Sequence, residues 1–240
     1  MDQDAAEGIP GSGAFGVVAR CKNKFDQKHS AIKKIAIGST PDDCFESVIR
    51  EARIWSLLDH RNVVKYHGCW VETAFWGGHE GGFIAEEKKP CLYLKLEACD
   101  SSLAAQTIND LKKICDIVQA VLKGLVYLHS KGIVHGDIRA ANILISDGKA
   151  KICDFGRASH GTDLDQKQDI KKFGLLIVEM LDPSALPDAR LRSRFPKEFK
   201  ALAEQLEEMT APNPETRPTS AELLRHKKKL IKAIMGIELR

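Results

Sequence analysis

The apolar pattern of this 240-residue chain changes character near residue 100. Before that point, short apolar or alternating runs between Gly, Pro and polar residues predict strands at Phe15–Ala19, Ser30–Ile37 and Cys91–Leu96. Apolar residues recur at helical spacing over Pro41–Leu58 and predict a single helix there. The Gly-rich stretch Val71–Pro90 predicts a mobile loop.

Beyond residue 100 the pattern is mostly helical. Apolar stripes predict helices over Leu111–Ser130, Asp169–Leu181, Lys197–Met209 and Thr219–Ile234. Two short apolar runs, Ile143–Ile145 and Lys149–Cys153, predict a hairpin that closes at Ser146-Asp147-Gly148. A strand-rich part followed by a helix-rich part predicts two lobes, with the ligand site between them.

Composition excludes several classes of protein. The chain is 43% hydrophobic and 29% charged, which is ordinary for a globular protein with a buried core. Its 36 basic and 33 acidic residues nearly balance, so neither nucleic-acid binding nor membrane-surface binding is expected. Seven cysteines without a C-x-x-C spacing argue against disulfides and zinc. The acidic start and the short apolar runs argue against a secretory signal and a membrane span, so we expect a soluble cytoplasmic protein.

A glycine-rich segment, Gly11-Ser12-Gly13-Ala14-Phe15-Gly16-Val17-Val18, lies near the start of the chain. Glycines let backbone amides approach phosphates closely. A dinucleotide-binding fingerprint would open a helix, whereas the residues that follow here favour a strand. Taken alone, the segment is equally compatible with a plain hairpin turn.

The segment is followed by an ordered set of further motifs. Ala31-Ile32-Lys33 lies in a predicted strand, and Glu51 lies in the predicted helix after it. His135-Gly136-Asp137-Ile138-Arg139-Ala140-Ala141-Asn142 and Asp154-Phe155-Gly156 come later. In this order and spacing, the set resembles the eukaryotic protein kinase family from nearly the first residue to about residue 230.

The resemblance implies a bilobal α+β fold that forms a single kinase domain over residues 1–240. A small lobe of antiparallel sheet with one helix would cover residues 1–99. A larger, mainly helical lobe would cover residues 101–240, and a hinge at residues 96–100 would join the two.

The resemblance also implies ATP and Mg²⁺ as cofactors. In the family, the glycine segment and the hinge enclose the nucleotide. The matching residues are Gly11, Ser12, Gly13, Ala14, Phe15, Gly16 and Val18 over the phosphates, Ala31 as the roof, and Glu97 and Cys99 at the hinge. Lys33 would hold the α and β phosphates, and Glu51 would hold Lys33.

The second lobe would supply the chemistry. By resemblance, Asp137 orients and deprotonates the acceptor hydroxyl, with Arg139 beside it, and a plain capping role is the alternative for Asp137. Asn142 and Asp154 would bind Mg²⁺. His135 is expected in the core beneath Phe155. Cys153 would face the nucleotide, where we interpret it as an inert buried thiol.

Within the family, residues 7 to 135 look most like the stress-responsive kinases of the translation initiation factor two α subunit. The segments that carry this likeness are Lys22–Asp26, Leu57–Tyr66, Gly68–Trp70 and Cys91–Glu97 with Cys99-Asp100. The likeness implies a protein substrate, with that α subunit as one candidate, or a partner kinase, and it allows a homodimer.

Three departures from the family concern the second half. Gly136 replaces the Arg that reads a phosphate on the activation segment. Arg139 stands where serine/threonine kinases have Lys, which leaves serine/threonine against tyrosine preference open. Only twelve residues, 157–168, separate Gly156 from Asp169, and the Ala-Pro-Glu triplet is missing. Arg217 would normally pair with that Glu, so it needs another acid or water.

These departures leave two pairs of alternatives open. The short segment reflects either evolution towards a loop-independent or degenerate kinase, or a skipped exon or truncated gene model. The function is either ATP-dependent protein phosphorylation, more plausibly on Ser or Thr and weak or atypical, or a pseudokinase that binds nucleotide and regulates a partner kinase.

Overall fold

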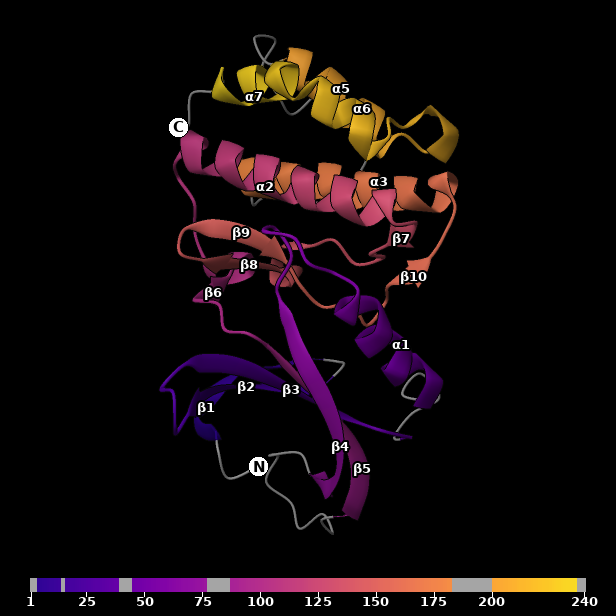
Figure 1. Ribbon diagram of the computed structural model, residues 1–240. Helices are drawn as coiled ribbons and strands as arrows, with labels where there is room; N and C mark the ends of the chain where they lie inside the picture. Colours follow the sequence, from indigo (N-terminus) through magenta and orange to yellow (C-terminus); the bar gives the residue numbers. More distant parts are fainter. Residues whose placement is uncertain (1–3, 14–15, 39–44, 77–86, 183–199, 237–240) are drawn as a thin grey trace. The chain divides into compact units, whose positions relative to one another are not determined.

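The computed structural model describes residues 4–13, 16–38, 45–76, 87–182 and 200–236 (Figure 1). The chain divides into two compact units. The first contains residues 1–59 and 64–99, and the second contains residues 60–63 and 100–240. The short excursion at residues 60–63 therefore packs with the second unit, although the chain on both sides of it belongs to the first.

The first unit is built on a five-stranded antiparallel sheet of strand order β1-β2-β3-β5-β4. Its strands are β1 (Asp4–Gly13), β2 (Gly16–Asn23), β3 (His29–Ala36), β4 (Tyr66–Trp76) and β5 (Glu87–Glu97). The three predicted strands are present, whereas β1 and β4 were not predicted.

The prediction of a loop over Val71–Pro90 is wrong at both ends of that range. Residues 71–76 belong to β4 and residues 87–90 to β5, where Thr73 pairs with Pro90. Pairing between neighbouring strands satisfies the backbone here whatever the polarity of the side chains. Residues 77–86 lie outside the described residues.

Strand register gives the sheet two distinct faces. Val18 lies opposite Lys33, and Ala31 lies two residues before Lys33 on β3, so all three share one face. The opposite face carries an apolar cluster of Cys21, Ile32, Ala36, Cys91 and Tyr93, with Ala19 and Trp70 packed against it. The sheet thus presents the residues expected at the nucleotide on one side and a buried core on the other.

Helix α1 (Phe45–Ser56) contacts β4 of the same unit. It buries Val48, Ala52, Ile54 and Trp55, and the Trp55 indole N–H donates to the Val64 carbonyl at 2.7 Å. Glu51 is buried on the same helix, which requires a charged partner. The start of the predicted helix, residues 41–44, lies outside the described residues.

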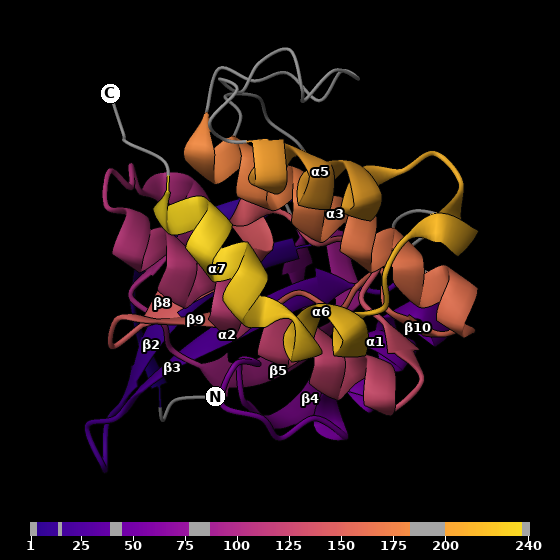
Figure 2. The ribbon, with the colours of Figure 1, turned by 90° about the horizontal axis from the view of Figure 1, so that it is seen from above.

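The second unit is mainly helical. Its helices are α2 (Leu111–Ser130), α3 (Asp163–Leu181), α5 (Lys200–Thr210), α6 (Ser220–Arg225) and α7 (Lys227–Met235). Helix α2 contacts α3, α6 and α7, and α3 packs beside α5 (Figure 2). None of the helices in the described ranges combines the length and apolar character that crossing a bilayer requires.

Two predicted helix boundaries are wrong. Helix α3 begins at Asp163 rather than Asp169, because Thr162 and Asp165 form a capping box that starts the helix earlier. The predicted helix over Thr219–Ile234 is two helices, since His226 leaves helical geometry with φ −99° and ψ 13°. The apolar spacing continues across this break, so periodicity alone does not reveal it. Residues 197–199 of another predicted helix lie outside the described residues.

Short strands complete the second unit. Strands β6 (Ser101–Ser102), β8 (Ile143–Ser146) and β9 (Lys149–Ile152) form a sheet of order β6-β8-β9. The predicted β8–β9 hairpin is confirmed, and it turns through Asp147 and Gly148, which have φ of 48° and 71°. Strands β7 (Ile133–Val134) and β10 (Ser159–His160) pair antiparallel.

Candidate active site

In the first unit, Lys33 on β3 and Glu51 on α1 form a buried ion pair. The Lys33 Nζ lies 2.8 Å from the Glu51 Oε1, and both side chains are almost fully buried. Two charges taken out of water are tolerated only when they are paired this well. The contact expected from the sequence is therefore present, and it fixes the lysine on the sheet face that also carries Val18 and Ala31.

The glycine segment forms a hairpin between two strands. Gly11 pairs with Val18, Ser12 with Val17 and Gly13 with Gly16. Because β2 follows the segment, and not a helix, this is not a dinucleotide-binding fingerprint. Ala14 and Phe15, at the tip, lie outside the described residues.

The predicted hinge begins where β5 ends. The Glu97 N–H donates to the Lys65 carbonyl at 2.9 Å, and the Glu97 Oε2 accepts from the Lys65 N–H at 3.1 Å. Ala31 lies opposite Leu96 across the β3–β5 pair. Cys99 is half-buried at the end of the first unit. The role of these residues at adenine stays a prediction.

In the second unit, Asn142 holds Asp137 in a defined orientation. The Asn142 Nδ2 donates to the Asp137 carbonyl at 2.8 Å and to the Asp137 Oδ2 at 2.9 Å. The Asp137 side chain is 18% exposed, so a substrate can still reach it. Both hydrogens of the Asn142 amide face Asp137, which leaves its Oδ1 to accept from, or coordinate, another group.

His135 is a buried structural residue, as predicted. Its ring meets Phe155 edge-on at 5.1 Å between centroids. The Nε2 lies 3.0 Å from the Cys153 carbonyl, and the Nδ1 accepts from the Asp137 N–H at 3.1 Å. Burial lowers the pKa of His135 below 6.5, although nearby acids including Asp169 oppose the shift. A neutral ring with its proton on Nε2 satisfies both contacts.

Asp169 of α3 anchors the loop that carries Asp137. Its carboxylate accepts from the backbone N–H of His135 at 2.8 Å and of Gly136 at 2.9 Å, and it contacts the His129 Nε2 at 3.1 Å. Burial raises the pKa of Asp169, but the hydrogen bond from His129 and the interactions with His135 lower it by more than burial raises it, so the net shift is downward. The sequence offered one signal for this role: an acid on the apolar stripe of a helix.

Lys172 is a second residue of α3 that sequence reasoning missed. Its Nζ donates to the Gly136 carbonyl and lies 4.0 Å from the Asp137 Oδ1. The Arg157 Nη1 lies 4.0 Å from the same oxygen. Asp169 and Lys172 are three residues apart, so one face of α3 holds both the N–H groups and a carbonyl of this loop.

Gly136 is required by the conformation of the loop. Its φ is +75°, and an added Cβ would lie 2.8 Å from the Arg157 carbonyl oxygen. A side chain at this position would therefore be strained and would collide with backbone. The conformation of this loop therefore excludes the arginine that the family usually has at position 136.

Asn142 and Asp154 are the residues predicted to hold Mg²⁺. The Cys153 N–H donates to the Asn142 carbonyl at 3.0 Å, which brings Asp154 next to Asn142. Amide and carboxylate oxygens are the ligands that Mg²⁺ prefers, with phosphates and water to complete the shell. The residues present fit Mg²⁺.

The short segment after Gly156 is folded throughout. Ser159 pairs with Val134 and His160 with Ile133 in the β10–β7 pair, and the Gly161 N–H donates to the Gly132 carbonyl at 3.0 Å. Residues 163–168 form the start of α3, and Thr162 caps it. The segment therefore connects the Asp154 loop directly to α3.

Arg217 does not pair with an acid in the described part of the chain. Its guanidinium belongs to a residue that is 3% exposed. It donates instead to the carbonyls of Ala211 at 2.8 Å, Lys167 at 3.1 Å and Pro212 at 3.2 Å, and to the Gln168 Oε1 at 3.0 Å. The short segment itself supplies two of these oxygens. Arg139, in contrast, is exposed, and its catalytic role rests on resemblance alone.

Comparison with known proteins agrees with this geometry. The family model described as protein kinase domain matches residues 6–173. The chain is 30% identical to the mouse interferon-induced, double-stranded RNA-activated protein kinase over 69% of its own length and 32% of that protein. It is 26% identical to the Arabidopsis thaliana eIF-2-alpha kinase GCN2 over 90% of its own length and 24% of that protein. The predicted likeness to initiation-factor kinases is confirmed, and the chain spans less than a third of either relative.

Proposed function

The chain belongs to the protein kinase domain family, and on that premise we propose that it transfers the γ-phosphoryl group of ATP to a hydroxyl of a protein. The observation that carries the proposal is the pair of hydrogen bonds from Asn142 to Asp137. These hydrogen bonds orient the carboxylate of Asp137. The loop that carries Asp137 is anchored by Asp169, which accepts from two backbone N–H groups of the loop. A protein that served only as a scaffold has no need of this alignment.

Each residue of the set has a distinct task. Lys33, held by Glu51, neutralises the α and β phosphates, and the glycine hairpin offers backbone amides. Asn142 and Asp154 would hold Mg²⁺, which supplies charge neutralisation at the transferred phosphate. Asp137 accepts the proton of the acceptor hydroxyl as that oxygen attacks phosphorus. We propose that the two units act as the lobes of one kinase domain.

We expect phosphoryl transfer to free peptides to be slow. In the family, the loop that ends at Ala-Pro-Glu forms the shelf that holds the acceptor. Here the chain runs from Gly156 through β10 directly into α3. Misplacing the hydroxyl by about 1 Å costs on the order of 100-fold in rate. Autophosphorylation and slow ATP hydrolysis are then the more visible activities.

The acceptor is a serine or threonine of a protein in the cytoplasm, and the α subunit of translation initiation factor two is the first candidate. The names of the relatives support this choice, since they include an eIF-2-alpha kinase and serine/threonine-protein kinases. A phosphorylation assay with this subunit, a generic serine/threonine peptide and a tyrosine peptide separates the three substrates. Preference for the tyrosine peptide would overturn the choice.

The second candidate is a pseudokinase that binds nucleotide and regulates a partner kinase. The missing Ala-Pro-Glu triplet favours it. Thermal unfolding with and without Mg²⁺-ATP, in the wild type and in Lys33→Ala, tests the shared step of nucleotide binding. A shift that depends on Lys33, without any phosphoryl transfer, would favour the pseudokinase, and the absence of a shift would contradict both.

A further inference from the structure

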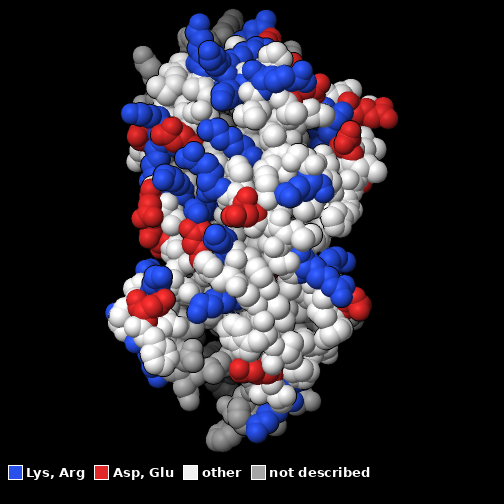
Figure 3. All heavy atoms as spheres, in the orientation of Figure 1, with Lys and Arg blue, Asp and Glu red and all other residues white. Residues whose placement is uncertain are grey.

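The second unit contains a basic surface cavity that phosphoryl transfer does not use. It has a volume of about 240 Å³ and lies between the residue 60–63 excursion, α2 and the β8–β9 hairpin. Figure 3 shows many Lys and Arg side chains on the second unit, with Asp and Glu side chains among them. The residues that line the cavity are Arg61, Asn62, Asp116, Gln119, Ala120, Lys123, Gly148, Lys149 and Ala150.

Three cations reach this cavity from three different elements. Arg61 comes from the excursion, Lys123 from α2 and Lys149 from β9. Within the described residues, none of the three side chains forms an ion pair or a hydrogen bond, and Asp116 is the single acid among the lining residues. Unpaired cations that converge on a concave surface favour an anionic ligand.

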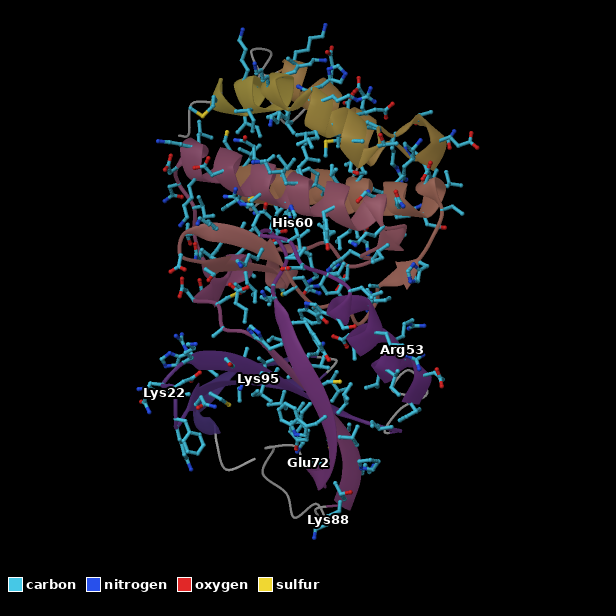
Figure 4. The ribbon with its side chains drawn as sticks, viewed as in Figure 1. Lys22, Arg53, His60, Glu72, Lys88 and Lys95 are labelled. Atoms are coloured by element: carbon cyan, nitrogen blue, oxygen red, sulfur yellow. The ribbon has the colours of Figure 1, made fainter. Side chains whose placement is uncertain are left out.

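The neighbouring His60 is also affected by the positive charges of this cavity. Its ring, labelled in Figure 4, stacks on Tyr127 of α2 at 4.8 Å between centroids. Burial lowers the pKa of His60, and the charges of Arg61 and Lys123 lower it further. Lys131 lies over the other ring of this stack, 5.3 Å from the centroid of Tyr127. The cations therefore continue along α2 beyond the cavity.

The cavity also offers a hydrogen-bond acceptor beside its cations. Gln119 of α2 donates through Nε2 to the Cys115 carbonyl at 3.4 Å, which leaves its Oε1 to accept from a ligand. A peptide brings carboxylates for the cations and backbone N–H groups for this oxygen, whereas the phosphate groups of a nucleic acid bring acceptors alone.

We propose that this cavity is a docking site for an acidic segment of a partner protein. Carboxylates of the segment contact Arg61, Lys123 and Lys149, and its backbone N–H groups donate to the Gln119 side chain. Asp116 opposes the carboxylates and limits the affinity. The site does not depend on the proposed phosphoryl transfer, because none of its residues belongs to the catalytic set.

A fluorescein-labelled oligoglutamate peptide is the probe, with an oligoglutamine peptide as the neutral comparison. At low ionic strength, anisotropy is expected to show binding of oligoglutamate alone. The variant Arg61→Glu/Lys123→Glu/Lys149→Glu is expected to bind at least about tenfold more weakly. The control Lys24→Glu/Arg53→Glu/Lys228→Glu makes the same change in net charge at exposed positions elsewhere and is expected to stay within about twofold (Arg53 is labelled in Figure 4).

Asp116→Asn gives a second, opposite test. Removing the single acid of the cavity is expected to tighten oligoglutamate binding by about two- to threefold, which a merely structural role would not produce. Hydrogen exchange should slow at residues 116–123 and 149–150 on binding. Equal loss in both triple variants, no effect of Asp116→Asn, or tighter binding of a single-stranded RNA probe at the same cations would each overturn the proposal.

Discussion

Lys172 donates a hydrogen bond to the carbonyl oxygen of Gly136, and it does so from the helical turn that follows Asp169. Asp169 accepts from the N–H of the same glycine at 2.9 Å. Two side chains on one face of α3 therefore bind both the N–H and the carbonyl group of Gly136, the residue before Asp137. A phosphate on the activation segment has no part in this contact, so the loop is ordered by the fold itself.

Lys172→Met should lower the rate of phosphoryl transfer by about 10- to 100-fold, because the loop can then shift Asp137 away from the acceptor. The affinity for Mg²⁺-ATP should stay within about twofold, since Lys172 does not touch the predicted nucleotide residues. Steady-state kinetics on Lys172→Met and on the neighbouring control Lys171→Met separate the two effects. An equal loss in both variants would contradict the assigned role.

Gly136→Ala should destabilise the fold more than Gly132→Ala. Both glycines have positive φ, +75° and +69°, so each substitution carries a strain of about 1–2 kcal/mol. Only the Cβ at 136 would meet backbone, at 2.8 Å, which adds about 1–3 kcal/mol for overpacking. Urea unfolding of the two variants gives the difference, and equal losses would show that the Arg157 carbonyl moves away freely.

Stability should fall as the pH drops below about 6.5. Folding lowers the pKa of His135 through burial, so between its folded and unfolded pKa values the unfolded chain binds more protons. The contribution is complete above 6.5 and is lost as the pH falls towards the folded value. Burial lowers the pKa of His60 and His67 as well, which adds to the slope.

Urea unfolding at several pH values measures this slope. His135→Gln should flatten it in part, whereas His226→Gln, at an exposed position, should leave it nearly unchanged. A slope that His135→Gln does not alter would contradict the assignment to the buried ring.

Activity should not depend on phosphorylation of the short segment. The hydroxyl residues after Gly156 and before α3 are Ser159 and Thr162, and Thr162 also caps α3 through Asp165. Ser159→Ala with Thr162→Asn removes both acceptors while keeping a side chain that caps well. Transfer rates should stay within a few fold of the wild type. A drop of about a hundredfold would reveal a phosphorylation switch that Lys172 does not replace.

The paired residues of the site could be predicted from sequence where a motif fixes their chemistry and spacing. Lys33 with Glu51, and Asp137 with Asn142, belong to this group, and the structure brings each pair into contact. Lys172 could not be predicted in this way. Its importance comes from where α3 packs against the loop, and a lysine on a helix otherwise indicates a solvated face.

The fold shows the same division. The β8–β9 hairpin followed from its turn residues, because Asp147 and Gly148 adopt the backbone conformations that such a turn requires. The full lengths of β4 and β5 could not be predicted, because strand pairing satisfies the backbone hydrogen-bonding groups of polar segments as well as those of apolar ones. The early start of α3 depended on a two-residue capping box that the apolar pattern does not contain.

Phosphate transfer from labelled ATP to the chain itself, compared between the wild type and Asp137→Asn, tests the central claim most directly. Asparagine keeps the size of Asp137 but does not accept the proton of the attacking hydroxyl. We expect measurable transfer that needs Mg²⁺ and falls by at least about 100-fold in the variant, with unchanged binding of Mg²⁺-ATP. Equal transfer by both proteins, or binding without transfer by either, would contradict it.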